Sequence, residues 1–160
     1  MARTQLHVLD SPINSTPGHH APVIVVGLDG STTSWDAFSW AAGETSRTHG
    51  TLITVYVAPA VEPGAVFGAP MSYGVCQETR DQIVRELSDE VDERARNLGV
   101  AVRFVREVGS PTDALTRFAR SVDADLIVVG KSSKARHHLF GSLGRRLVSR
   151  HDGPPVVVVP

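Results

Sequence analysis

Short apolar runs rich in β-branched residues alternate with longer amphipathic segments along this chain. Each run has the length of a strand and stops near a glycine or a proline, as buried strands do. Four of the predicted strands are the apolar runs Val23–Val26, Leu52–Val57, Leu126–Val129 and Val156–Val159. The remaining strand, third in the chain, is predicted from the alternation of Val100, Val102 and Phe104 with Ala101 and Arg103, and it closes near Val108. Strands that alternate with helices in this way predict an α/β fold: a single doubly wound five-stranded parallel sheet with helices on both faces.

The amphipathic segments between these runs are predicted helices. The first covers residues 31–48, and its apolar face consists of Ala37, Phe38, Ala41, Ala42 and Thr45. The second covers residues 77–97, where acidic residues face water and one stripe consists of Ile83, Val84, Leu87, Val91 and Leu98. Gly50 and Gly99 follow these two segments, as expected past the last turn of a helix.

A third helix is predicted to begin at Ser110, with Ser110 as its cap and Pro111 at the first helical position. Its buried face consists of Ala114, Leu115, Phe118, Ala119 and Val122. A short fourth helix is expected over residues 142–150.

Two segments lack the periodicity of a strand or a helix. Residues 1–21 contain Pro12, Pro17 and Gly18, and we interpret them as a flexible leader before one domain at 22–160. Residues 59–74 are rich in glycine and proline, so they form either a lid near a site or a surface excursion. The surface excursion is the interpretation that we favour.

Bulk properties narrow the class of protein. The 160 residues are 41% hydrophobic and 21% charged, with a formal net charge of −1, which gives no general attraction to nucleic acid or anionic lipid. The lone cysteine, Cys76, excludes an intrachain disulfide framework and suits a reducing compartment. Because no apolar run approaches about 20 residues, and no signal-like segment opens the chain, we expect a cytoplasmic protein without a membrane or nucleic-acid partner.

Two junctions, far apart in sequence, carry the candidate site. Gly27 to Ser31 follows the first predicted strand, and Gly130 follows the fourth. If those strands are neighbours, both junctions meet at the carboxyl edge of the sheet, where such folds bind ligands. Asp29 can accept hydrogen bonds from a ribose or base, and Gly30 can turn with positive φ. Alternatively, Asp29 caps the first helix or orders the turn.

A basic stretch follows the second junction. From Lys131 to Arg150 the chain carries several lysines and arginines and no acidic residue, although it is nearly neutral overall. Gly141 and Ser142 open the helix predicted there, so its free N–H groups and the Ser142 hydroxyl can hold a phosphate. The alternative is a solvated basic face with Gly141 as an ordinary loop residue. We expect no enzyme, because no nucleophile–base arrangement or paired carboxylates occur at the junctions.

These residues resemble the universal stress protein family. The resemblance covers residues 22–160, and the segments that carry it are Val25–Ser31 with Ser34, Ala37–Phe38 and Trp40–Ala41; Gly109–Pro111; Ala124–Gly130; and Gly141–Ser142 with Arg146–Val148 and Pro155–Val159. The family implies a sheet of order 3-2-1-4-5, usually in a homodimer, and a stress-response role. One subclass binds ATP between the loops after strands one and four.

Carried over by position, the ATP-binding subclass assigns two groups of residues. Gly27, Leu28, Asp29 and Val57 would surround adenine and ribose. Gly130, Gly141, Ser142 and Leu143 would serve the phosphates, with Mg²⁺ as an accompanying ion.

The second junction departs from the pattern of that subclass. The subclass has Gly-x-x-Gly, nine residues and then Gly-Ser or Gly-Thr, whereas this chain has Ser133 at the second glycine and only seven residues before Gly141. A Cβ at Ser133 restricts how closely the backbone approaches a phosphate. The alternatives are therefore a protein of the same fold that prefers cyclic AMP, or a dimeric interaction protein that binds no ATP.

The last predicted strand and Trp35 bear on how the protein packs and assembles. Val156–Val159 is apolar on both faces and lies at a sheet edge in the implied order, so it predicts a homodimer through this strand. Trp35 lies either at the rim of the pocket or on a helix packing face, and the sequence does not separate these two positions.

Overall fold

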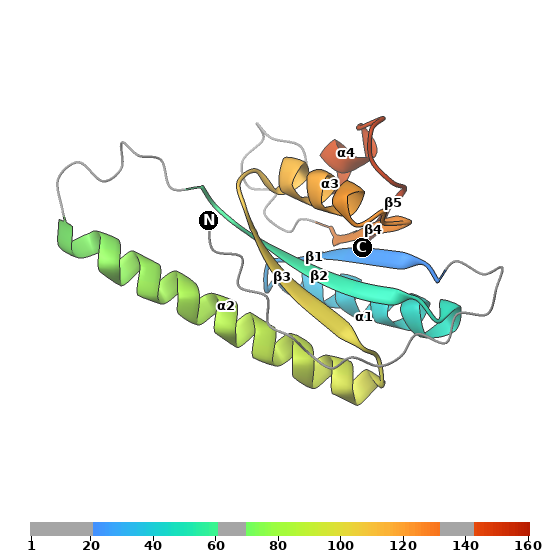
Figure 1. The fold of residues 1–160 in the computed structure, drawn as a ribbon, viewed down its shortest axis with the longest axis horizontal. Coiled ribbons are helices and arrows are strands. Elements are labelled where there is room, and N and C mark those ends of the chain that lie inside the picture. Colours follow the sequence, from blue (N-terminus) through green and yellow to red (C-terminus); the bar gives the residue numbers. More distant parts are fainter. Residues whose placement is uncertain (1–20, 61–69, 132–142) are drawn as a thin grey trace.

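The computed structural model describes residues 21–60, 70–131 and 143–160. A five-stranded parallel sheet of order β3-β2-β1-β4-β5 runs through them, as the sequence predicts (Figure 1). The strands are β1 (Val23–Leu28), β2 (Thr51–Ala58), β3 (Val102–Val108), β4 (Leu126–Gly130) and β5 (Val156–Val159). The domain boundaries at 21 and 22 remain a prediction.

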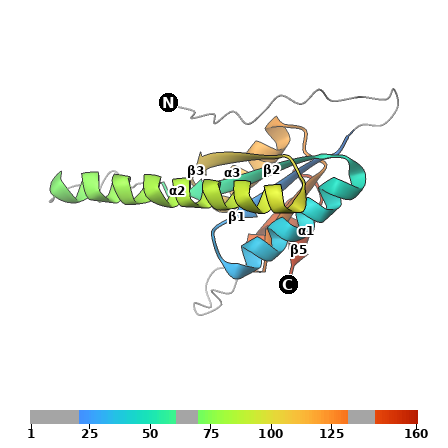
Figure 2. The ribbon, with the colours of Figure 1, turned by 90° about the horizontal axis from the view of Figure 1, so that it is seen from below.

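Helices cover both faces of the sheet. On one face lie α1 (Thr32–Thr48) and α2 (Pro70–Leu98), and on the other lie α3 (Pro111–Ser121) and α4 (Leu143–Val148) (Figures 1 and 2). Alternate residues of β1 serve the two layers, because Ile24 and Val26 belong to the α1/α2 core and Val25 to the α3 core. Burial on both faces explains why the central strands β1, β2 and β4 are nearly continuous apolar runs, whereas the edge strand β3 alternates apolar residues with exposed charged ones. No helix in the described ranges has the apolar length needed to span a bilayer.

The buried faces of α1 and α3 agree with the predicted ones. All five predicted α1 residues are buried, and Ser34 and Trp35 join them. In α3 four of the predicted residues are buried, whereas Val122 forms the C-cap and is half-buried. Ser110 is the N-cap residue and Pro111 follows it, but Ser110 makes no side-chain cap hydrogen bond.

The predicted start of α2 is wrong, and its predicted stripe is confirmed at Leu87 and Val91 but not at Ile83 and Leu98. The helix begins at Pro70, so residues 70–74 are helical rather than part of the excursion, and residues 61–69 lie outside the described residues. Proline is acceptable in the first turn, and the about 1 kcal/mol cost of Gly74 is too small to end a long helix. The buried row is Leu87, Val91 and Ala95.

The predicted stripe is wrong at its two ends. Ile83 is 40% exposed and Leu98 is 50% exposed. Ile83 stands four positions before Leu87 in the same row, but this row reaches the core only from Leu87 onward, and the small side chain of Ala95 continues it. The fourth helix is also shorter than predicted, because α4 stops at Val148.

Trp35 lies on a helix packing face. Its ring makes an edge-on contact with Phe38, with 5.9 Å between centroids, and the Arg94 guanidinium of α2 lies 4.4 Å above the ring. These contacts join α1 to α2 and settle the alternative that the sequence left open.

One buried hydroxyl in the sheet supports a stability prediction. Thr54 of β2 is fully buried, and its Oγ1 has no hydrogen-bond partner among the described residues. We expect Thr54→Val to raise the free energy of unfolding by about 1 kcal/mol, since the valine keeps the shape and removes an unsatisfied polar group. Urea unfolding followed by circular dichroism measures this change.

A second buried threonine supplies the control for that measurement. The Thr45 hydroxyl donates to Ala41 O at 2.8 Å, so Thr45→Val is expected to bring no gain in stability. If Thr54→Val leaves stability unchanged or lowers it, a buried water already satisfies the Thr54 hydroxyl.

Candidate functional site

A pocket opens at the carboxyl ends of the central strands. Strand β1 pairs with β2 on one side and with β4 on the other, so the chain reverses its direction of winding at β1. The adjacency of β1 and β4 on which the sequence argument depends is therefore present. Both junctions lie at this edge, where ligands bind in doubly wound folds.

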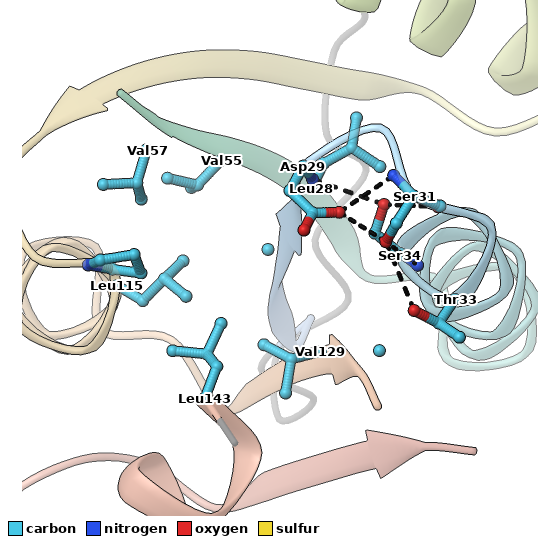
Figure 3. Close-up of a pocket in the computed structure, with 13 residues that line it drawn as sticks. Leu28, Asp29, Ser31, Thr33, Ser34, Val55, Val57, Leu115, Val129 and Leu143 are labelled. Atoms are coloured by element: carbon cyan, nitrogen blue, oxygen red, sulfur yellow. Dashed lines mark hydrogen bonds between the residues drawn. The ribbon is translucent and has the colours of Figure 1, made fainter. Parts of the chain in front are cut away.

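The pocket has one apolar wall and one polar wall (Figure 3). The apolar side chains come from β2, β4, α3 and α4, and they are Val55, Val57, Val129, Leu115 and Leu143. The polar side comes from the β1–α1 turn, with Asp29, Ser31, Thr33 and Ser34. Gly27, Leu28, Pro111 and Gly130 complete the lining. A ligand with an apolar ring at one end and polar groups at the other matches this division.

Hydrogen bonds fix the shape of the polar wall. Asp29 Oδ1 accepts from Ser31 N at 3.0 Å and from Ser31 Oγ at 2.6 Å. Ser34 Oγ donates to Ser31 O at 2.8 Å, and Gly30 takes the predicted positive φ of 81°. The structure therefore supports the interpretation that Asp29 orders the turn.

The cap of α1 is Ser31, not Asp29. Ser31 has extended backbone geometry, and its Oγ accepts from Ser34 N at 3.3 Å. Asp29 contributes indirectly, because its carboxylate accepts the hydrogen bond from Ser31 Oγ. This carboxylate is exposed at the pocket. A side chain in this position can meet a ligand as well as stabilise the turn.

Two glycines leave the space on which the pocket depends. A Cβ added to Gly27 would lie 3.1 Å from Leu115 Cδ1 and 3.3 Å from Val129 Cγ1, so a larger residue would enter the apolar side of the pocket. A Cβ added to Gly130 would lie 2.2 Å from Thr33 O. The end of β4 therefore touches the backbone of the first turn of α1, which only a glycine permits.

That close approach gives a second prediction. Gly130→Ala is expected to lower the free energy of unfolding by about 3 kcal/mol, because the new methyl group meets backbone atoms that cannot rotate away. Gly43→Ala, in the middle of α1, is the matched control. Its Cβ would meet nothing closer than Arg47 Nη1 at 3.5 Å, so it is expected to be neutral or to stabilise by up to about 1 kcal/mol. Equal effects in urea unfolding would contradict the close contact.

The structure brings most of the predicted site residues to one place. Gly27, Leu28, Asp29, Val57, Gly130 and Leu143 all line the pocket. Gly141 and Ser142 lie outside the described residues, as does Ser133. The roles of these eight site residues in ligand binding remain predictions.

Sequence reasoning missed the contribution of α3. Leu115 was placed only in the buried face of its helix, and Pro111 only at the helix start, yet both line the pocket. Both follow from topology, since α3 begins at the carboxyl edge of β3, the same edge that carries the site. Thr33 and Ser34 could have been predicted in the same way, because they belong to the first turn of the helix that follows the Asp29 junction.

Positive charge in the C-terminal stretch is partly neutralised by ion pairs on the surface of the protein. Arg150 Nη1 donates to Asp113 Oδ1 at 2.6 Å, and its Nε and Nη2 donate to the two oxygens of Asp152 at 3.0 and 3.1 Å. The hydrogen bond from Arg150 lowers the pKa of Asp113 and that of Asp152, while Asp152 and then Asp113 raise the pKa of Arg150. Within the described ranges, no three or more His, Cys, Asp or Glu side chains form a group that could hold a metal ion.

Comparison with known proteins identifies the family. The model of the universal stress protein family matches residues 22–160. The chain belongs to the universal stress protein family. A universal stress protein of Methanocaldococcus jannaschii is 28% identical to it over 137 residues, which are 84% of this chain and 80% of the relative.

Solved universal stress proteins share the fold. The protein from Burkholderia pseudomallei is 29% identical, with a TM-score of 0.68 over 90% of this chain and 99% of its own. The UspA protein of Lactobacillus plantarum is 21% identical, with a TM-score of 0.72 over 89% of this chain and 99% of its own. A universal stress protein solved in complex with cAMP is 24% identical, with a TM-score of 0.66 over 87% and 97% of the two chains.

Proposed function

We propose that this protein is a cytoplasmic stress-response regulator that binds an adenine nucleotide in the pocket between the β1–α1 turn and the end of β4. The observation that carries the proposal is the division of that pocket into an apolar and a polar wall at the switch point of the sheet. Binding, rather than turnover, is the proposed activity, because the described lining is largely apolar and its one close hydroxyl–carboxylate pair, Ser31 and Asp29, orders the β1–α1 turn.

In this proposal each wall of the pocket binds a different part of the nucleotide. The adenine packs among Val57, Leu115 and Leu143, where apolar side chains surround a flat ring. Gly27 leaves the room for it, and Leu28 lies beside it. The Asp29 carboxylate accepts from the ribose hydroxyls at the opposite wall. Gly130, Gly141 and Ser142 then meet the phosphates through backbone N–H groups and a hydroxyl, with Mg²⁺ as a counter-ion for a polyphosphate.

The number of phosphates separates two candidates. ATP is the ligand that the family resemblance implies, whereas cyclic AMP needs a much smaller phosphate cradle. The replacement of a glycine by Ser133 and the seven-residue spacing to Gly141 favour the smaller cradle. The solved relative in complex with cAMP supports the view that this fold can accept such a ligand.

Calorimetric titration with ATP, ADP and cyclic AMP tests the proposal. The wild type is expected to bind at least one of them, and Gly27→Val is expected to weaken that binding at least ten-fold by filling the apolar side of the pocket. Gly27→Ala is the milder variant, and Gly43→Ala, away from the pocket, is the control. Absence of heat with all three ligands at millimolar concentration would leave an interaction protein with an unused pocket.

We further propose a homodimer through the outer edge of β5. Hydrogen bonds from Ile127 N to Pro155 O and from Lys131 N to Val159 O tie β5 to β4. Because backbone groups alternate along a strand, those of Val156 and Val158 point away from the sheet. Val158 is 41% exposed, and Val148 on the adjacent α4 is 61% exposed. An open apolar edge of this kind pairs readily with a second copy.

Sedimentation analysis of two substitutions at Val158 tests the dimer. Val158→Pro removes the outward N–H without touching the hydrogen bonds to β4, and it is expected to yield monomers. Val158→Thr keeps that N–H and is expected to remain dimeric. A dimer that persists in Val158→Pro would place the interface elsewhere.

A further inference from the structure

A chain of ion pairs lies along α3 and ties the C-terminal connection to it. Arg150, just after α4, binds Asp113 in the first turn of α3 at 2.6 Å. It also binds Asp152, which in turn lies 3.4 Å from Arg120 in the last turn of α3. The segment between α4 and β5 is therefore fastened at both ends of one helix.

These pairs fasten two elements that form the same pocket wall. Leu115 and Pro111 come from α3, and Leu143 comes from α4. The six-residue α4 packs on the core through Leu147 and against Val158 at Gly144, and these are the two of its residues that are buried. An element with so few buried contacts is expected to open locally with a small free energy. The hydrogen bonds of Arg150, which follows α4, are therefore expected to influence the position of Leu143, the first residue of the same helix.

We propose that Arg150 is a positioning residue for ligand binding. It holds α4 against α3 so that Leu143 and Leu115 face each other across the apolar end of the pocket. Arg150 does this from outside the pocket, because it is not among the described residues that line it and its guanidinium is directed at Asp113 and Asp152. This inference rests on the proposed nucleotide binding, and it adds a group outside the pocket that sets the affinity.

We expect the ion pairs of Arg150 to affect the position of α4 more than the overall stability of the protein. A single exposed ion pair contributes little to overall stability, and Arg150 is about one-third exposed. Two carboxylates on one guanidinium, one of them held by two parallel bonds, give stronger orientation than a single pair. The expected result of losing Arg150 is a looser α4 in a protein that stays folded.

Three substitutions separate positioning from direct contact and from general stability. Arg150→Gln and Asp113→Asn each break the link between α4 and α3. Arg117→Gln is the matched control, since Arg117 on the same helix pairs with Glu107 of β3 at 3.4 Å and does not reach α4. Each protein is titrated with ATP and with adenosine by calorimetry, and its melting temperature is recorded.

Positioning predicts that Arg150→Gln and Asp113→Asn weaken both ligands by roughly five-fold, while Arg117→Gln binds as the wild type does. Adenosine carries no phosphate, so its loss of affinity reports on the adenine and ribose contacts without the phosphate site. If Arg150 held a phosphate directly, Arg150→Gln would weaken ATP only, and Asp113→Asn would leave ATP binding unchanged or improve it. Either of those results overturns the inference.

Hydrogen exchange gives a readout that needs no ligand. Exchange at the amides of Leu147 and Ser149 is expected to be faster in Arg150→Gln than in Arg117→Gln, because the end of α4 opens more often. Equal exchange rates would overturn the positioning role even if ATP binds. If the wild type binds none of ATP, ADP, cyclic AMP and adenosine, the proposed function fails, and the exchange rates still decide whether Arg150 sets the position of α4.

Discussion

The contact between the end of β4 and the first turn of α1 is the constraint on which the site depends. At Gly130 the backbone of β4 approaches Thr33 O so closely that a side chain has no room. This contact brings together two segments that lie about a hundred residues apart in sequence, Asp29–Ser34 and Val129–Gly130. The polar turn and the apolar wall then share one pocket, and the rest of the sheet supports that arrangement by pairing β1 with both neighbours.

The fold could be predicted because four strands are apolar, β-branched runs that end near a turn residue, while β3 shows the alternation of a strand with one solvated face, and the strand order then follows from the family resemblance. The start of α2 could not, since Pro70 and Gly74 are typical of loops and only the free energy of a long helix outweighs them. The stripe on α2 could be predicted only in part. Hydrophobicity correctly marked Leu87 and Val91, whereas Ile83, four positions earlier in the same row, is exposed and the small side chain of Ala95 is buried.

The residues of the site also divide into those that could be predicted from the sequence and those that could not. Gly27, Asp29 and Gly130 were visible because a junction after a strand has few possible positions in a parallel sheet. Leu115 was visible only as a core residue, since its place at the pocket depends on how α3 lies over the strand ends. The pairing of Arg150 with Asp113, across 37 positions, depends on the docking of two helices and leaves no pattern in the sequence.

The two tryptophans occupy unlike surroundings on one helix. Trp35 is 9% exposed and lies beneath the Arg94 guanidinium, whereas Trp40 is 38% exposed. A soluble quencher that collides with indole rings therefore reaches Trp40 far more readily than Trp35. The shielded part of the emission belongs to the seam between α1 and α2, which gives the protein an intrinsic optical signal for the integrity of that layer, without any attached dye.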